Sequence, residues 1–219
     1  MIKGTIVLNF KAYSEILGDS AVTIAKNIAS VHNKGFELIL VPTLLTLREV
    51  AKTIKIPVYS PHTDPFPPGP HTGGIIIDEL KKLGIKGTLL NHSEKKLPFS
   101  ILTKTVEYCK KKQFPVILCT SSLTEVKKMI TLKPEYLAFE PPELIGGKIS
   151  VSKAKPLSII KTVQVVKKIN PQTQVLCGAG IQNRDDLQKA LQLGAQGVLL
   201  SHALIKTKKP EKVLEMMLS

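Results

Sequence analysis

The sequence predicts an α/β protein that folds as a single (βα)8 barrel domain over residues 1–219. Short apolar stretches alternate with longer amphipathic stretches along the whole chain, which is typical of parallel strands joined by crossover helices. Eight such strands leave roughly 27 residues for each unit of the 219-residue chain, enough for a barrel with short loops. No linker-like stretch or change of composition divides the chain, so we expect one domain.

Local patterns mark the individual elements. The helix after the first strand carries apolar residues with the helical period from Ala21 to Val31. The helix after the fifth strand begins with Ser122 and Glu125, which have the spacing of a capping box. The eight strands are expected to begin near Thr5, Phe36, Pro57, Lys86, Pro115, Tyr136, Gln174 and Gly197.

Two segments half a chain apart repeat one pattern. LGIKGTLLNH at 83–92 and LGAQGVLLSH at 193–202 share a Leu-Gly pair at a helix end, a Gly at a strand start and a His just past the strand. The helix before the second copy is expected to begin at Asn183, with two aspartates in its first turn, and to end at Gly194. The repeat predicts that these are the fourth and eighth units, on opposite sides of a closed barrel.

The formal net charge of +14 raises the question of nucleic acid. The lysines fall at helix-surface spacings and aromatic residues make up only 5% of the chain, so stacking platforms for a single strand are scarce. We therefore expect a solvated basic surface and no specific nucleic-acid partner. A weak attraction for polyanions, small phosphorylated metabolites included, stays open.

Cysteine usage and hydropathy indicate a reduced, cytoplasmic protein without a membrane partner. Cys109, Cys119 and Cys177 are odd in number and widely spaced, which disfavours both a disulfide scaffold and a CxxC metal site. No stretch resembles a targeting signal or approaches the roughly 18 apolar residues of a membrane span.

Three strand ends carry ionisable side chains. Glu140 closes the apolar run EYLAFE and is followed at once by PPELIGGK, which has the composition of a hinged lid. His92 ends the strand in LLNHSEKK, and Lys11 follows the strand TIVLNF. Because a barrel exposes its chemistry at the carboxyl ends of its strands, we expect this carboxylate, imidazole and ammonium to meet there.

The motifs NFK, NHSEKK, AFEPPELIGG, CGAGI and GVLLSHALIK, in this order and spacing, resemble the triosephosphate isomerase family in its shorter archaeal form. The resemblance covers essentially the whole chain. It implies a TIM barrel that interconverts dihydroxyacetone phosphate and D-glyceraldehyde 3-phosphate through an enediol(ate), in glycolysis and gluconeogenesis. The sequence has no P-loop, no Rossmann fingerprint and no metal-ligand cluster among its five scattered histidines, so we expect a reaction without cofactor or metal.

The family, itself the established example of a carboxylate base beside a neutral imidazole, implies roles for the strand-end residues. Glu140 would be the base, made more basic by desolvation under the lid. His92 would polarise the carbonyl as neutral imidazole, helped by a short helical turn after it. Lys11 would offset the negative charge of substrate and enediolate, while Asn9 would orient Lys11 or touch the substrate.

A phosphate grip is expected where small residues let backbone N–H groups approach a dianion. We assign it to Gly178, Ala179 and Gly180, to Ser201 and His202 at a helix start, and to Ile145 and Gly146 in the lid. The His202 ring would either take up a proton when phosphate binds or pack on Leu204 or Ile205, leaving only its backbone N–H to the ligand. Two tracts depart from the usual family pattern, the lid triplet Gly146-Gly147-Lys148 and Ser201-His202-Ala203. The first departure concerns the closing of the lid, and the second concerns the geometry of the phosphate site.

Two other functions are weighed against the isomerase. One is a different cofactor-free phosphate-binding barrel enzyme, such as a synthase or epimerase, and the other is a non-catalytic basic protein that binds polyanions. The joint presence of Lys11, His92 and Glu140 argues against the former, and turnover without metal or cofactor would dismiss the latter.

A homo-oligomer, dimer or tetramer, is expected from SPHTDPFPPGPHTGG at 60–74. Its five prolines make a stiff loop that has little entropy to lose on docking, and the family uses the corresponding loop to enter a neighbouring subunit.

Overall fold

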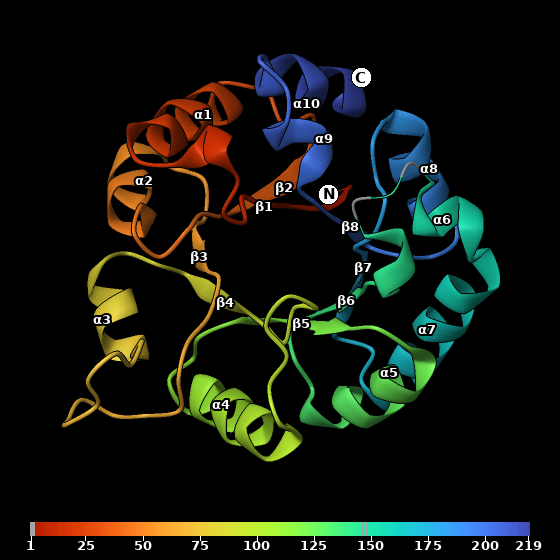
Figure 1. The fold of residues 1–219 in the computed structure, drawn as a ribbon. Helices are drawn as coiled ribbons and strands as arrows, with labels where there is room; N and C mark the ends of the chain where they lie inside the picture. Colours follow the sequence, from red (N-terminus) through yellow and green to blue (C-terminus); the bar gives the residue numbers. More distant parts are fainter. Residues whose placement is uncertain (1–2, 146, 148) are drawn as a thin grey trace.

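Eight parallel strands form a barrel with helices around it, as the sequence predicts (Figure 1). The computed structural model describes residues 3–145, 147 and 149–219. Neighbouring strands follow the order β2-β1-β8-β7-β6-β5-β4-β3. A single parallel bridge between Leu40 and Val58 links the two ends of this order, and there the Leu40 N–H donates to the Pro57 carbonyl at 3.0 Å. The strands are β1 (Gly4–Asn9), β2 (Phe36–Val41), β3 (Tyr59–Ser60), β4 (Gly87–Leu90), β5 (Val116–Thr120), β6 (Tyr136–Phe139), β7 (Gln174–Cys177) and β8 (Gly197–Leu200).

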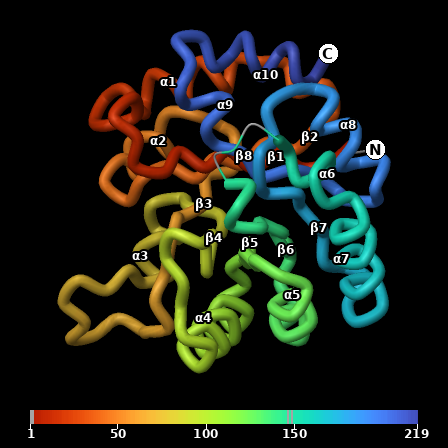
Figure 2. Tube along the Cα trace, turned by 45° about the vertical axis from the view of Figure 1, so that its right-hand side comes forward, coloured from red at the N-terminus to blue at the C-terminus, as the bar shows by residue number. Residues whose placement is uncertain are grey.

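The helices alternate with the strands and surround the barrel in both views (Figures 1 and 2). They are α1 (Asp19–Ala29), α2 (Leu47–Thr53), α3 (Ile77–Lys82), α4 (Phe99–Lys111), α5 (Leu123–Met129), α6 (Val151–Ala154), α7 (Pro156–Ile169), α8 (Arg184–Gln192), α9 (His202–Ile205) and α10 (Pro210–Leu218). Short 3-10 turns occupy Ser14–Ile16, Ile130–Leu132 and Pro142–Leu144. Within the described ranges, none of the helices has the length and apolar character needed to cross a membrane.

The expected element boundaries are confirmed to within two residues. A difference of two residues occurs at β3, which begins at Tyr59 and not at Pro57, because Val58 pairs with β2 only through an isolated bridge. The repeated segments are the fourth and eighth units as expected. In each, the glycine that ends the preceding helix is left-handed, with φ of 85° at Gly84 and 93° at Gly194.

Both expected helix caps are present. The Asn183 side chain accepts the Asp186 N–H at 3.1 Å and begins α8. The Ser122 hydroxyl accepts the Glu125 N–H at 3.2 Å and begins α5. The return half of this second motif differs from the expected capping box, since the Glu125 carboxylate accepts the N–H of Ser121 at 2.8 Å, one residue earlier.

Apolar side chains form one cluster inside the barrel and another between the barrel and the helices. On β1, Val7 belongs to the inner cluster while Ile6 and Leu8 belong to the outer one, as strand alternation requires. The same alternation turns Asn9 towards the barrel interior at the carboxyl end of β1. The inner cluster consists of Val7, Ile39, Val41, Tyr59, Leu89, Ile117, Cys119, Tyr136, Ala138, Leu176 and Leu199.

The proline-rich segment between β3 and α3 projects away from the barrel (Figures 1 and 2). Its base is closed by two hydrogen bonds of 2.8 Å, from the Asp64 N–H to the Ile75 carbonyl and from the Ile75 N–H to the Asp64 carboxylate. Near its tip, the Phe66 and His71 rings stack with centroids 4.4 Å apart. The loop therefore holds its shape through contacts of its own.

Candidate active site

A cavity opens at the carboxyl ends of the strands. Lys11 after β1, His92 after β4 and Glu140 after β6 line it together with residues that follow β7 and β8. The three ionisable side chains that the sequence singles out therefore meet in one place, although they are far apart in the chain.

Glu140 is a buried carboxylic acid, with 2% of its surface exposed. Burial raises its pKa to about 7, against the opposing influence of a hydrogen bond with the Cys119 thiol and of the Lys11 charge. Its backbone N–H donates to the Thr120 carbonyl at 2.7 Å, which continues the β5–β6 pairing up to the site. Its Oε2 atom is buried and has no hydrogen-bond partner among the described residues. One oxygen of the carboxylate is thus available to a molecule in the cavity.

Gly178 makes room for this carboxylate. A Cβ atom at position 178 would lie 2.3 Å from the Glu140 Cγ and 2.9 Å from its Cδ. Gly178 also lines the cavity, so the phosphate-grip role that the sequence predicts for it stays a prediction beside this seating of Glu140.

His92 faces Glu140 across the cavity. Its Nδ1 accepts the Glu94 N–H at 3.2 Å, so the ring proton resides on Nε2, which lies 3.7 Å from the Glu140 Oε1. Burial lowers the pKa of His92 to about 4; the Glu94 charge opposes this and the Lys11 charge adds to it. The expected helical turn after His92 is a turn closed by the Lys95 N–H to the His92 carbonyl, 2.8 Å, without a helix. Burial, more than a helix N-terminus, thus keeps the imidazole neutral.

Neighbouring residues hold both the backbone and the side-chain ammonium of Lys11. Its backbone is left-handed, with φ of 53°, and its N–H donates to the Asn9 side chain at 3.0 Å. Its ammonium pairs with the Glu94 carboxylate at 2.6 Å. Asn9 therefore orients the Lys11 backbone. A left-handed lysine is an uncommon conformation that costs free energy and is typical of functional positions.

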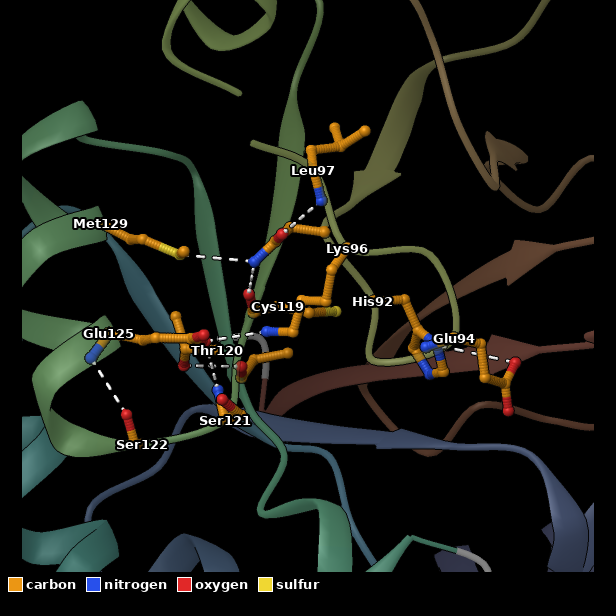
Figure 3. A network of polar contacts seen from close by, with 12 residues as sticks. His92, Glu94, Lys96, Leu97, Cys119, Thr120, Ser121, Ser122, Glu125 and Met129 are labelled. Atoms are coloured by element: carbon orange, nitrogen blue, oxygen red, sulfur yellow. Dashed lines mark hydrogen bonds and ion pairs between the residues drawn. The ribbon is translucent and has the colours of Figure 1, made fainter. Parts of the chain in front are cut away.

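A polar network fixes the segment that carries His92. The Asn91 side chain donates to the Cys119 carbonyl of β5 at 2.9 Å and accepts the Leu97 N–H at 3.1 Å. Figure 3 shows Lys96 of the same segment reaching Glu125 of α5, with a separation of 2.8 Å. The chain after β4 is thereby fastened to the neighbouring unit on both sides of His92.

The residues assigned to the phosphate grip are partly brought together. Gly180 and Ser201 line the cavity, and the Ser201 hydroxyl oxygen is buried without a partner among the described residues. Ala179 does not line it; this residue is buried and its carbonyl accepts the Val151 N–H at 2.9 Å. Gly180 is left-handed, with φ of 68°, and a Cβ there would lie 2.2 Å from the Ile149 carbonyl oxygen.

The remaining grip residues lie in the lid and in α9. Ile145 lines the cavity, whereas Gly146 lies outside the described residues. His202 also lines it, and its exposed ring meets the Tyr13 ring edge to face, with centroids 6.4 Å apart. The His202 ring therefore packs against Tyr13, which also lines the cavity.

Sequence reasoning missed several residues of the site, among them the polar side chains of Tyr13, Glu94 and Gln182. Tyr13 lines the cavity, and the Gln182 side chain lines it and donates to the Gly147 carbonyl at 2.9 Å. Glu94 pairs with Lys11 through its carboxylate and donates its backbone N–H to His92. Glu94 stands two residues after His92 in the motif NHSEKK, and that spacing is the signal that could have identified it. Among the described residues, no group of three or more His, Cys, Asp or Glu side chains could hold a metal ion.

Comparison with known proteins identifies the family. The sequence model of triosephosphate isomerase matches residues 4–217. A triosephosphate isomerase from Methanothermus fervidus is 41% identical over 216 residues, which cover 98% of this chain and 97% of that protein. One from Methanocaldococcus jannaschii is 41% identical over 210 residues, 95% of this chain and 96% of that protein. One from Methanosarcina barkeri is 41% identical over 211 residues, 96% and 95% respectively. With this agreement over nearly its full length, the chain belongs to the triosephosphate isomerase family.

Proposed function

We propose that this isomerase interconverts its two triose phosphates with Glu140 as the base, His92 as the hydrogen-bond donor to the reacting oxygens and Lys11 as the compensating charge. The observation that carries the proposal is the pair formed by Glu140 and His92. A buried carboxylate with one free oxygen faces a protonated Nε2 of a neutral imidazole across the same cavity.

The reaction follows from this pair. Glu140 takes the proton from the carbon next to the carbonyl, and the electron pair left behind forms the carbon–carbon double bond of the enediolate. The Nε2–H of His92 donates to the oxygen on which the negative charge develops. The hydroxyl proton then moves from one oxygen of the enediolate to the other, and Glu140 returns its proton to the neighbouring carbon, so the aldose and ketose exchange with no net change of atoms or charge. Burial suits Glu140 to this task, because a base with a pKa of about 7 is both ionised and effective near neutral pH.

The phosphate group is proposed to lie against Ser201 and the backbone around Gly180. Of the four buried side-chain oxygens without a partner in the described ranges, two line this cavity, one on Glu140 and one on Ser201. Buried polar atoms are rarely left unsatisfied, so the Ser201 hydroxyl supports a polar ligand at this end of the cavity.

An isomerase assay with two histidine variants tests the role of His92. The assay is coupled to a dehydrogenase and contains a chelator, and the variants are His92→Gln and the exposed-loop control His32→Gln. We expect His92→Gln to lose about 10² to 10⁴ in kcat, the usual contribution of a positioned acid or base, while His32→Gln keeps full activity. Full kcat in a folded His92→Gln protein would contradict the assignment.

We also propose a homo-oligomer in which residues 60–74 of one subunit enter a hollow on another. The support is a hollow lined by Lys11, His92, Pro42, Leu44 and others, beside Leu45 with 93% of its surface exposed. Sedimentation of Leu45→Lys at micromolar concentration should show smaller species than the wild type, with Leu157→Lys on α7 as the exposed-leucine control. An active wild-type monomer at this concentration would refute the proposal.

We further propose that residues 1–219 form one domain and that the protein is located in the cytoplasm. Limited proteolysis and fractionation of the cells that express the protein would test them.

A further inference from the structure

We propose that the end of the barrel opposite the active site binds the phosphate backbone of double-stranded nucleic acid, without regard to base sequence. We call this surface the lysine face. It consists of lysines at the ends of α3, α4 and α7 and after the 3-10 turn that follows α5, namely Lys81, Lys110, Lys111, Lys133, Lys167 and Lys168. The proposal goes beyond the isomerase reaction and does not depend on it.

The topology of the barrel brings these lysines to one end. The strands are parallel and the cavity with Glu140 lies at their carboxyl ends, so each helix runs back and finishes near the amino end of the next strand. In this way α3, α4 and α7 end a few residues before β4, β5 and β7 (Figure 1). The lysine face and the active site are therefore at opposite ends of the molecule.

The lysines of neighbouring units lie side by side. The Lys81 ammonium donates to the Lys112 carbonyl at 2.8 Å, which places the end of α3 against the end of α4. The 3-10 turn Ile130–Leu132, directly before Lys133, contacts both α4 and α7. The lysine face thus continues from α3 across α4 and Lys133 to α7.

The charge of this surface is exposed and largely uncompensated. All six lysines are exposed, and none forms an ion pair with a carboxylate in the part of the chain that the structure describes. Of the carboxylates nearby, Asp78 pairs with Lys112 at 2.7 Å, and Glu135 accepts the Val116 N–H at 2.8 Å at the barrel mouth. The fold therefore leaves a positive surface open to an anionic partner.

Helix stability accounts for only part of this pattern. Lysines in the last turn of a helix interact favourably with the partial negative charge there, which is sufficient reason for the pairs that end α4 and α7. Lys133 lies outside any α-helix and is left-handed, with φ of 46°, where glycine or asparagine is the usual residue. Its ammonium, more than its backbone preference, explains a lysine at this position.

The spacing of the lysines suits a phosphate backbone. Packed helices lie roughly 8 to 10 Å apart, which is close to the Debye length of about 10 Å at 0.1 M salt. The potentials of lysines on neighbouring helices therefore add together. A duplex carries one negative charge per about 1.7 Å of its axis, so a rigid row of lysines meets several phosphates at once and releases their counterions.

The other side chains at this end favour a duplex over a membrane or a single strand. Ile169 is the exposed large apolar residue here among the described residues, so there is little to insert into a bilayer. The rings of Tyr59 and Tyr136 at the barrel mouth are buried and offer no platform on which bases could stack. Contacts limited to phosphates carry no sequence information, in keeping with the absence of a specific nucleic-acid partner that the sequence predicts.

The test measures the binding of fluorescent DNA and RNA duplexes of mixed sequence by anisotropy, between about 50 and 200 mM salt. The variant Lys110→Gln/Lys111→Gln is compared with Lys208→Gln/Lys209→Gln, which removes the same charge from exposed lysines at the active-site end, close to the Lys206–Glu15 ion pair. Lys167→Gln/Lys168→Gln is a second, independent variant of the lysine face.

We expect the wild type to bind both duplexes with a Kd of about 10⁻⁴ to 10⁻⁶ M near physiological salt. Each variant of the lysine face should lose one or two phosphate contacts, which lowers the salt slope by about 0.9 per contact and weakens binding roughly 8- to 60-fold near 0.1 M salt. The Lys208→Gln/Lys209→Gln control should bind as the wild type does. Equal losses in the control and in the lysine-face variants would show that net charge alone attracts the duplex, and would overturn the proposal.

Two further measurements separate the lysine face from the other end of the barrel and from a membrane. A saturating duplex should leave kcat and KM of the wild type unchanged, whereas inhibition that competes with substrate would place the duplex in the active site and overturn the proposal. Vesicles that contain phosphatidylserine should bind more weakly than the duplexes do. Binding to these vesicles without binding to either duplex, or no binding of a duplex even at about 50 mM salt, would also overturn it.

Discussion

Gly178→Ala tests how tightly the base is seated. The added Cβ would lie 2.3 Å from the Cγ of Glu140 and 2.9 Å from its Oε1. Carbon atoms rest at about 3.5 Å or more, so the Glu140 side chain must move by roughly 1 Å. The Glu140 Cγ atom is only two bonds from its own backbone, and the residue is buried. It therefore cannot move aside as the end of a long surface side chain could.

Two effects of different size follow from this displacement. Overpacking a core typically lowers the free energy of unfolding by about 1 to 3 kcal/mol, which the barrel should survive. A misplacement of about 1 Å in a catalytic group can lower the rate about 10²-fold. We therefore expect a folded Gly178→Ala protein whose kcat falls by about two orders of magnitude while the affinity for a phosphate-bearing analogue changes only a few-fold.

Steady-state kinetics, analogue titration and thermal unfolding measure these quantities. Gly69→Ala is the matched control, because a Cβ there would meet its nearest neighbour, the His71 ring, at an ordinary 3.5 Å. If Gly178→Ala keeps its kcat and instead loses analogue affinity, Gly178 belongs to the phosphate grip and the reasoning is wrong.

Three further predictions concern charge at the site. Because burial raises the pKa of Glu140 to about 7, kcat/KM should rise with pH to about 7 and then level off. The profile is corrected for the second ionisation of the substrate phosphate, near about 6. A corrected profile that is flat over this range would contradict the prediction. The folded protein binds this proton more tightly than the unfolded chain, so the ionised carboxylate costs stability that grows as pH rises from 4.5 through about 7. Glu140→Gln should accordingly be more stable than the wild type at pH 8, by up to roughly 3 kcal/mol in denaturant titration, and a lower stability would refute this. His202→Ser should keep the affinity for a phosphate-bearing analogue within about threefold, since the ring packs on Tyr13, whereas a tenfold loss confined to low pH would indicate that the ring binds phosphate.

The fold could be predicted from the sequence because its signals are local. The Asn183 cap and the left-handed glycines at 84 and 194 each depend on a few adjacent residues. The positions of Lys11, His92 and Glu140 were also accessible, because the end of a strand in a barrel fixes where a side chain lies without any knowledge of its partners.

The contacts within the site could not be predicted in the same way. Glu94 meets Lys11, 83 positions away, and Asp186 meets Ser150, 36 positions away. Such pairs depend on how loops from different strands pack, and no local pattern records this. The contact between Gly178 and Glu140 could not be predicted for the same reason, since only the packed structure shows Glu140 in the space that the missing side chain leaves.

The most direct test of the central claim is the turnover of Glu140→Gln, measured beside its affinity for a substrate analogue. The substitution removes the base but keeps the size of the side chain and leaves the phosphate contacts in place. We predict a loss of about 10² to 10⁴ in kcat, with analogue affinity changed far less. Turnover close to that of the wild type in the purified, folded variant would contradict it.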